Sequence, residues 1–183
     1  MDREFIQKYL KDFANLILLS SEITAELVCV KDILVTASEN GKKVIIVGNG
    51  GSSAMASHVS VDLTKNAGIR CINFNESDLI TCFANDYGYE NWVTEAIKAY
   101  CFNEDLIILI SSSGTSKNIV NAAQYCNENN IKLITLSGFK YDNPLSKLGN
   151  VNFHVKSSDY NFIEMIHHII LVSIVDIFAK KIF

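Results

Sequence analysis

Two pairs of acidic and imidazole side chains stand at helical spacing in the sequence. His58 and Asp62 are four residues apart, and so are Glu164 and His168. Residues at i and i+4 leave the same face of a helix, so the two side chains of each pair can meet one ligand. An imidazole beside a carboxylate can transfer protons, or the two can share a metal ion. The alternative for His58 is a partly buried histidine that is bound to the backbone.

Glu164 stands in an apolar stretch of the chain, together with His167 and His168. Burial of an unpaired carboxylate is expensive, so we expect Glu164 to have a hydrogen-bonding partner or a metal ion. The competing interpretation is a polar stripe of the helix that simply faces solvent.

Residues 48–52 (Gly-Asn-Gly-Gly-Ser), here called the glycine loop, have the composition of an anion-binding turn. The loop follows the apolar residues 44–47, and Ser52 is placed to cap the helix that comes next. Such a junction points backbone N–H groups and the positive end of a helix dipole into one pocket. The alternative is an ordinary tight connection that binds nothing.

Residues 111–116, here called the serine loop, offer five hydroxyl groups around Gly114, directly after the apolar run 106–110. Hydroxyl and N–H donors can hold phosphate oxygens without a lysine or a metal ion. The alternative is a serine-rich turn in which Ser116 only caps a helix. Neither loop ends in Gly-Lys-Ser/Thr, which argues against nucleotide binding of the Walker type.

Alternating strands and helices are expected to position these groups. The periodicity predicts strands at 44–47, 71–74, 106–110, 131–136 and 151–155. It predicts helices at 3–38 with a break at Ser20-Ser21, then at 52–65, 78–83, 90–99, 116–129, 144–148 and 160–181, with a polar turn at 85–88. This order is typical of a three-layer α/β sandwich with a five-stranded parallel sheet, preceded by N-terminal helices. Ligands bind such sheets where the carboxyl ends of the strands meet.

Composition and charge limit the class of protein. The 183 residues fit one domain, with helices for packing and oligomerisation in 1–40 and the α/β core in 41–183. The formal net charge of −4 argues against nucleic-acid binding through bulk positive charge. We expect no membrane segment, because no apolar run reaches spanning length, and no signal peptide, because the N-terminus is charged. Five cysteines without a C-x-x-C pair favour free thiols in a reducing cytoplasm.

Four motifs, in this order, resemble those of the SIS (sugar isomerase) domain family, and most closely the phosphoheptose isomerases. They are Gly48-Asn49-Gly50-Gly51-Ser52, His58-x-x-x-Asp62-Leu63, Ala84-Asn85-Asp86-Tyr87-Gly88-Tyr89-Glu90 and Ile110-Ser111-Ser112-Ser113-Gly114-Thr115-Ser116-x-Asn118. The resemblance covers nearly the whole chain and implies the flavodoxin-like fold of the family. It also implies an isomerase that converts sedoheptulose 7-phosphate to D-glycero-D-manno-heptose 7-phosphate through an enediol, for lipopolysaccharide or capsule.

The resemblance further implies a set of site residues. The positions that hold the sugar phosphate match Ser111, Ser112, Ser113 and Ser116. The positions that contact the sugar match Asn49, Gly50, Gly51, Ser52, Asn85 and Asp86. For zinc and catalysis, His58 matches a metal ligand, Asp62 a ligand and base, and Glu164 a member of the metal and catalytic set. Members of the family are homotetramers in which neighbouring subunits share active sites.

The sequence departs from the family pattern at Val172, where the phosphoheptose isomerases carry a histidine. Valine can neither ligate a metal nor transfer a proton. His168 lies one turn earlier, on nearly the same helix face as Glu164, and our hypothesis is that it replaces the missing histidine as ligand or acid. The alternatives are a catalytically impaired phosphosugar-binding or regulatory protein of the same fold, and an isomerase of another phosphosugar.

Overall fold

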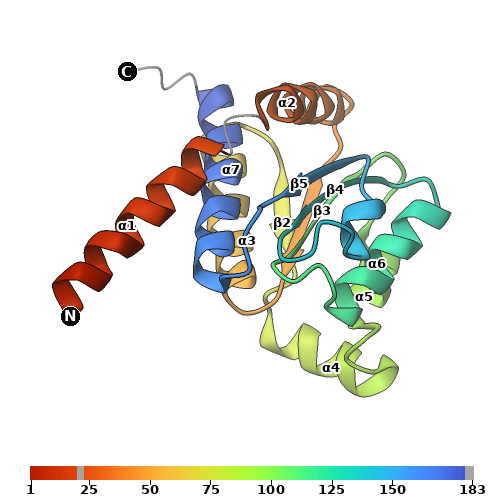
Figure 1. Cartoon of the computed structure of the whole chain (residues 1–183). Coiled ribbons are helices and arrows are strands. Elements are labelled where there is room, and N and C mark those ends of the chain that lie inside the picture. The colour runs from red at the N-terminus through yellow and green to blue at the C-terminus, as the bar shows by residue number, and fades with distance from the viewer. Residues whose placement is uncertain (20–22, 180–183) are drawn as a thin grey trace.

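Five parallel strands form a sheet in the computed structural model, which describes residues 1–19 and 23–179 (Figure 1). The strands are β1 (Val44–Gly48), β2 (Cys71–Asn73), β3 (Leu106–Ser111), β4 (Lys132–Ser137) and β5 (Val151–His154). Their order in the sheet is β2-β1-β3-β4-β5, and every pairing is parallel. The predicted five-stranded parallel sheet is therefore confirmed, and its order is the flavodoxin-like one.

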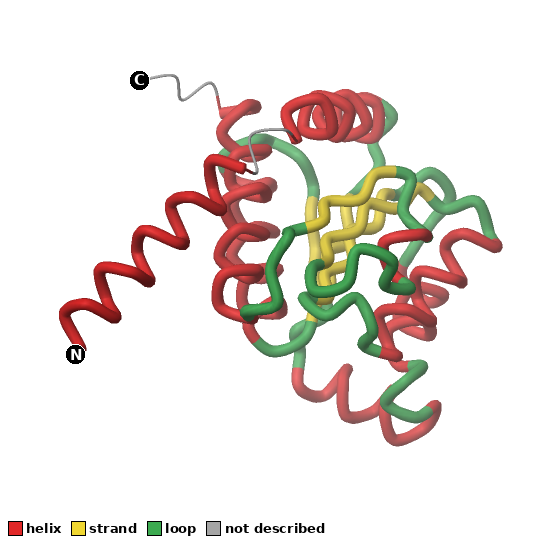
Figure 2. Tube along the Cα trace, in the orientation of Figure 1, coloured by secondary structure: helices red, strands yellow, loops and turns green. Residues whose placement is uncertain are grey.

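Helices cover both faces of this sheet (Figure 2). One face carries α2 (Thr24–Glu39), α3 (Gly51–Lys65) and α7 (Tyr160–Ala179). The other carries α4 (Ser77–Tyr87), α5 (Trp92–Tyr100), α6 (Lys117–Glu128) and the short 3-10 helix η2 (Leu145–Lys147). Helix α1 (Asp2–Leu19) runs beside α7 and then projects from the body of the molecule (Figure 1). The result is the three-layer arrangement that the sequence predicts.

Strand β1 shows how the two layers of core are built. Val44 and Ile46 belong to the apolar cluster with α2, α3 and α7, whereas Ile45 and Val47 belong to the cluster with α5 and α6. Because side chains alternate between the faces of a strand and both faces are covered, β1 and β3 are buried along their whole length. These two central strands form a rigid base for the loops that leave their carboxyl ends.

Helix α4 is longer than predicted. The turn predicted at 85–88 is wrong for residues 85–87, because α4 continues to Tyr87. Gly88, with a φ of 84°, is the C-cap of the helix. Leu79, Ile80 and Phe83 pack against the core and hold the helix in place, while the polar residues that follow occupy its exposed side. Tertiary packing has overridden a local turn signal.

The predicted helix caps are also corrected by the structure. Helix α3 begins at Gly51, and Gly50, with a φ of 55°, takes the N-cap position that was expected of Ser52. Ser116 does precede α6, but its side chain makes no capping hydrogen bond. The break predicted at Ser20-Ser21 lies outside the described residues.

Helix α7 corrects the expectation that no segment reaches membrane-spanning length. It has 20 residues, and an 18-residue window within it has a mean hydropathy of 1.9, so it passes that test by length and composition alone. However, one side of the helix, with Ile163, Ile166 and Ile170, packs in the core against the sheet. The apolar composition is explained by this place in the fold.

The five cysteines are all free thiols, as the sequence predicts. Burial raises the pKa of Cys71 and of Cys126 to about 12, so both thiols stay protonated and act as small core side chains. Cys29 and Cys82 are exposed on α2 and α4.

Candidate active site

The glycine loop and the serine loop leave neighbouring strands at the point where the chain changes sides of the sheet. β1 pairs directly with β3, with Gly48 opposite Ile110. The chain passes from β1 to α3 on one face and from β3 to α6 on the other face. In open α/β sheets, ligands bind in the crevice that opens at such a switch point. The two predicted binding loops therefore share the preferred place for a ligand.

The glycine loop uses its own amides to make a tight turn. Ser52 N–H donates to Asn49 O at 3.0 Å, and the N–H groups of Ser53 and Ala54 donate to Gly50 O at 3.0 and 3.1 Å. A Cβ on Gly48 would lie 2.6 Å from the Cβ of Ser52, so only glycine fits where the strand meets the helix. With these amides engaged, the glycine loop is less suited to an anion than its composition indicates.

Glu164 lies over the amino end of α3. It comes from α7 and is partly buried, and a Cβ on Gly51 would overlap its Oε2. A carboxylate at a helix N-terminus is stabilised by the helix dipole. Gly51 leaves room for this carboxylate, which places a negative charge beside the glycine loop. The hydrogen-bonding partner or metal ion expected for Glu164 stays a prediction.

The serine loop is folded back on itself by hydrogen bonds at its two ends. Ser111 Oγ donates to Ser116 Oγ at 3.0 Å, and Gly114 N–H donates to Ser111 O at 2.9 Å. The Thr115 hydroxyl donates to Ser113 Oγ at 3.0 Å. Gly114 has a φ of 66°, a conformation that favours glycine and lets the loop reverse.

Ser112 is the member of the serine loop that has no partner. Its side chain is 6% exposed, and its Oγ is buried without a hydrogen bond in the structure. Buried hydroxyl groups almost always have a partner, so this one is a natural contact for a ligand. Because Ser116 does not cap α6, the amino end of that helix also stays available to an anion. The serine loop, rather than the glycine loop, is the better phosphate site.

Asn49 and Asn118 join the glycine loop to the first turn of α6, the helix that follows the serine loop. The Nδ2 of each amide donates to the Oδ1 of the other, both at 2.9 Å, and Asn118 is only 2% exposed. The Tyr89 hydroxyl, from the turn between α4 and α5, donates to Asn49 Oδ1 at 3.3 Å. Sequence reasoning assigned no role to Asn118 or Tyr89, although both stand inside the quoted motifs.

His58 stands at the centre of a line of contacts between α3 and α7. Its Nδ1 lies 2.9 Å from His168 Nε2, and its Nε2 lies 3.2 Å from Asp62 Oδ2. Asn66 Nδ2 donates to the other oxygen of Asp62 at 3.0 Å. If His58 Nε2–H donates to Asp62, its Nδ1 must accept from His168, which leaves the Nδ1 lone pair of His168 at the end of the line.

The local environment lowers the pKa of His168. Burial lowers its pKa, the neighbouring His58 lowers it further, and Asp62 opposes these effects. A neutral imidazole at the end of an Asp–His–His line can accept a proton, and the resulting charge can be stabilised by the carboxylate behind it.

His167 and Val172 belong to the core instead. His167 is fully buried, its Nε2 lies 3.0 Å from Ser137 O, and burial lowers its pKa to about 4. Val172 is partly buried and packs against the apolar cluster beneath α7. The position that carries histidine in the phosphoheptose isomerases therefore contributes to packing here.

Asn85 and Asp86 lie on the last turn of α4 and are exposed. Asn85 Nδ2 donates to Asp86 Oδ1 at 2.9 Å. Tyr89, three residues further on, links this segment to the glycine loop through its hydrogen bond to Asn49. The structure thus brings the segment to the rim of the crevice through Tyr89.

The predicted zinc ligands do not surround one point. Zinc in proteins needs at least three donors around the ion. Within residues 1–19 and 23–179, no three His, Cys, Asp or Glu side chains are placed to hold a metal ion. His58 directs its two nitrogens at different partners, and Glu164 lies against Gly51 instead. The arrangement fits a line of proton-transfer groups better than a metal centre.

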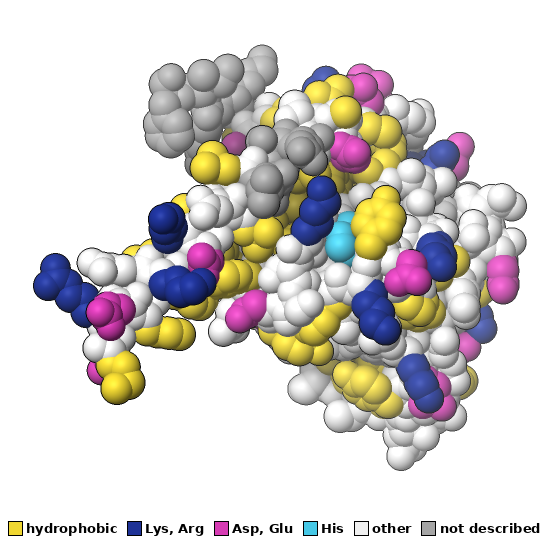
Figure 3. Space-filling view, viewed as in Figure 1, with side chains coloured by type: hydrophobic (Ala, Val, Ile, Leu, Met, Phe, Trp, Pro, Cys, Tyr) yellow, Lys and Arg dark blue, Asp and Glu magenta, His cyan; other side chains and the backbone are white. Residues whose placement is uncertain are grey.

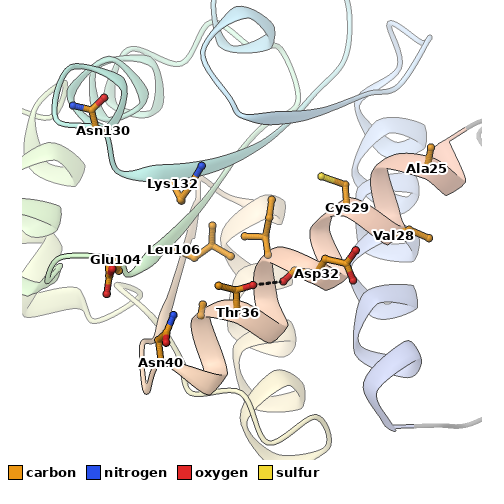
Figure 4. A pocket seen from close by; sticks show the side chains of 12 residues that line it. Ala25, Val28, Cys29, Asp32, Thr36, Asn40, Glu104, Leu106, Asn130 and Lys132 are labelled. Atoms are coloured by element: carbon orange, nitrogen blue, oxygen red, sulfur yellow. Dashed lines mark hydrogen bonds between the residues drawn. The ribbon is translucent and has the colours of Figure 1, made fainter.

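A cavity of about 740 Å³ lies away from these groups (Figure 4). It opens between α2, with Val28 and Thr36, and the residues Leu106 and Lys132 at the amino ends of β3 and β4. The switch point is at the opposite, carboxyl edge of the sheet. The cavity is therefore not part of the candidate active site.

Known proteins resemble the chain in both sequence and structure. The SIS domain family model matches residues 8–138. A phosphoheptose isomerase of Geotalea uraniireducens is 30% identical over 168 residues, which cover 88% of each chain. Phosphoheptose isomerase 2 of Campylobacter jejuni is 34% identical over 148 residues, 74% of each chain. The structure of a phosphoheptose isomerase from Francisella tularensis superposes with a TM-score of 0.90 at 24% identity, over 99% of this chain and 100% of that one.

Proposed function

Because this chain belongs to the SIS domain family, we propose that it is a phosphosugar isomerase that converts sedoheptulose 7-phosphate to D-glycero-D-manno-heptose 7-phosphate. The curated relatives named above carry the name phosphoheptose isomerase. One observation carries the proposal: Glu164, a proton-transfer group, lies over the same glycine loop that Asn49 and Asn118 tie to the first turn of α6, directly after the serine loop. A phosphate site and an acid–base group thus share one crevice.

The serine loop binds the phosphate in this proposal. The buried Ser112 hydroxyl and the free amino end of α6 donate to the phosphate oxygens. Glu164 already places a negative charge at the amino end of α3, so a phosphate is directed away from the glycine loop. The carbon chain of the sugar then lies across the glycine loop, where Asn49 meets it.

Proton transfer takes place along the seam between α3 and α7. Glu164 and His168 are one turn apart on α7, about 6 Å along the helix, and both face α3. Glu164 takes the proton from the carbon beside the carbonyl and returns a proton to the former carbonyl carbon, while His168 moves a proton between the two sugar oxygens through the enediol. Asp62 and His58 orient His168 from behind, as the acid orients the base in a catalytic triad.

The surface of α1 supports a homotetramer, the assembly typical of the family. Figure 3 shows hydrophobic side chains on this projecting helix. Phe5, Ile6 and Leu10 are 67%, 54% and 59% exposed. A second subunit would bury them and would complete a site shared between subunits. We place the enzyme in the cytoplasm, where it supplies heptose for lipopolysaccharide or capsule.

One observation favours a second candidate, a phosphosugar-binding or regulatory protein without turnover. Val172 packs in the core, so the proton-transfer group that the phosphoheptose isomerases carry there is missing. The two candidates differ in whether the bound sugar exchanges a carbon-bound proton with solvent.

Incubation with sedoheptulose 7-phosphate in D₂O separates the two candidates. We expect NMR to show deuterium entering the sugar as the aldose product forms, and binding without exchange would support the regulatory protein. Fructose 6-phosphate in a parallel sample tests whether another phosphosugar is the substrate. EDTA tests the zinc hypothesis: the ligand arrangement predicts that exchange survives chelation, and loss that added zinc restores would show a metal requirement.

The variant His168→Ala tests the assignment of the proton-transfer group. We expect it to bind the sugar phosphate and to lose exchange by about 100-fold or more. Ser173→Ala is a matched control, because this hydroxyl lies on α7 but donates only to Ile169 O, at 2.7 Å. Wild-type exchange in His168→Ala would show that His168 takes no part.

A further inference from the structure

The reciprocal amide pair between Asn49 and Asn118 determines what Asn49 can offer to a ligand. Its Oδ1 accepts from Asn118 Nδ2 and from the Tyr89 hydroxyl, at 2.9 and 3.3 Å. An amide oxygen has two lone pairs, so both are used. Its Nδ2 has two hydrogens, and one of them is donated to Asn118 Oδ1. Asn49 is left with one hydrogen-bond donor and no acceptor.

Asn118 is placed to hold this state firmly. It is 2% exposed, it stands in the first turn of α6, and α6 is packed on the sheet by Ile119, Ala122 and Ala123. Asn49 sits in the glycine loop, and its backbone oxygen accepts a hydrogen bond from Ser52 N–H at 3.0 Å. Rotation of the Asn49 amide alone by 180° would bring nitrogen against nitrogen and oxygen against oxygen, and both hydrogen bonds of the pair would be lost. The Tyr89 hydroxyl, which donates to Asn49 Oδ1, favours the present orientation of the pair.

We propose that Asn118 is a positioning residue that fixes Asn49 as a hydrogen-bond donor to the sugar oxygen that becomes negatively charged in the enediolate. This inference deepens the proposed isomerase function and rests on it. When the proton leaves the carbon, negative charge develops on the former carbonyl oxygen. A preorganised N–H stabilises that charge without reorganisation, whereas a freely rotating amide could present its oxygen instead.

The kinetic test compares Asn118→Ala, Asn118→Asp and Asn49→Ala with the wild type. The side chain in Asn118→Asp still accepts a hydrogen bond from Asn49 but no longer donates one. Because this variant keeps nearly the same side-chain volume, it also serves if Asn118→Ala unfolds. We expect kcat to fall by about 10- to 100-fold in both Asn118 variants, with KM changed by less than about threefold. Equal changes in KM and kcat, or none, would overturn the proposal.

The double variant Asn49→Ala/Asn118→Ala tests whether Asn118 acts through Asn49. We expect its kcat to equal that of Asn49→Ala alone, because nothing remains for Asn118 to orient. Independent, multiplying losses would contradict the proposal. Asn129→Ala is the matched control: this amide lies at the other end of α6, donates to Tyr125 O at 2.8 Å, and should leave kcat unchanged.

A binding measurement separates this inference from the proposed function. A phosphorylated aldonohydroxamate mimics the planar enediolate, and the matching alditol phosphate lacks the developing charge. We expect Asn118→Ala to lose affinity for the hydroxamate about tenfold, by calorimetry, and to keep its affinity for the alditol phosphate. If wild-type protein shows no deuterium exchange, the isomerase proposal fails. The ratio of the affinities for the hydroxamate and the alditol phosphate still tests Asn118. An unchanged ratio would overturn the role of Asn118 alone.

Discussion

At the scale of single residues, Gly51 controls where the carboxylate of Glu164 can lie. A side chain at this position would meet Glu164 Oε2 and lie 3.1 Å from Oε1. The clashing atoms are the far end of a flexible side chain, so the collision displaces Glu164 and leaves the backbone in place. Glycine is thus needed here for the position of a functional group rather than for backbone conformation.

The variant Gly51→Ala should therefore separate activity from stability. Alanine is a better helix former than glycine by about 1 kcal/mol in a helix interior, so we expect the free energy of unfolding to stay constant or to rise. We expect isomerase turnover to fall by about tenfold or more, because Glu164 leaves the amino end of α3. Urea unfolding and deuterium exchange measure the two quantities on the same sample. Full activity in Gly51→Ala would show that the position of Glu164 is unimportant.

For single residues, the sequence predicted pairs on one helix but not contacts between distant segments. The i,i+4 spacing of His58 with Asp62 and of Glu164 with His168 predicted which side chains share a face, because helix geometry fixes such pairs. The contact between His58 and His168 joins residues that are 110 positions apart, so spacing along one helix could not predict it. Asn118 had no local signal of its role, because its partner lies on another loop.

At the scale of elements, the strand–turn–helix unit from β1 to α3 determines the geometry of the site. Its existence followed from an apolar run, a glycine cluster and a helical pattern. The N-cap residue of α3 was predicted wrongly, because serine is the commoner N-cap and the structure instead uses Gly50, which has a positive φ. The end of α4 was missed for a related reason: turn-forming residues such as Asn85 are tolerated in a helix that apolar contacts already hold.

The variant Gly48→Ala tests whether this unit is as tight as the contacts indicate. The new Cβ would lie 2.6 Å from Ser52 Cβ and 2.8 Å from the Ser52 backbone carbon, so the backbone must move. We expect a loss of about 1–3 kcal/mol in the free energy of unfolding, measured with urea, together with loss of turnover. Adding Ser52→Gly removes the first of these contacts and should recover part of the stability. Wild-type stability in Gly48→Ala would show that the turn accommodates a Cβ at this position without strain.

At the scale of the whole molecule, the sequence predicted the layers well because both faces of the sheet are covered. Continuous apolar strands and amphipathic helices leave few alternatives to a parallel sandwich. The sequence did not predict which side chains of α1 pack on the core and which stay exposed. Phe13, Leu16 and Ile17 of α1 pack on the core, but Phe5 and Leu10 are left exposed by the single chain. In the proposed assembly a second subunit covers those residues.

The variant Leu10→Asp tests the proposed assembly. If α1 packs between subunits, a buried aspartate there would be costly, and light scattering after size exclusion should show a smaller species than for the wild type. Lys11→Glu is the control, because it changes charge at an exposed position on the same helix. We expect far-ultraviolet circular dichroism of Leu10→Asp to match the wild type. An unchanged mass would exclude this face of α1 as a subunit contact.

The buried His167 makes the stability of the whole fold depend on pH. Its pKa is lowered to about 4: burial is the main cause, the hydrogen bond to Ser137 O opposes it, and the neighbouring His154 adds a smaller lowering effect. An unfolded chain binds that proton near pH 6.5. Above pH 6.5 the imidazole is neutral in both states and stability does not change. As the pH falls from 6.5 toward 4, the unfolded state binds the proton first, so the fold loses up to about 3 kcal/mol.

The variant His167→Gln should remove this part of the pH dependence. Its amide can still donate to Ser137 O but does not titrate in this range. Between pH 7 and pH 5 we expect urea unfolding to show that the wild type loses about 2 kcal/mol more than the variant does. Carboxylates also titrate on this side of neutrality, but they do so equally in both proteins, so the difference isolates His167. If the free energy of unfolding changed equally with pH in the two proteins, His167 would bind its proton as readily in the folded state as in the unfolded state. That result would contradict the prediction.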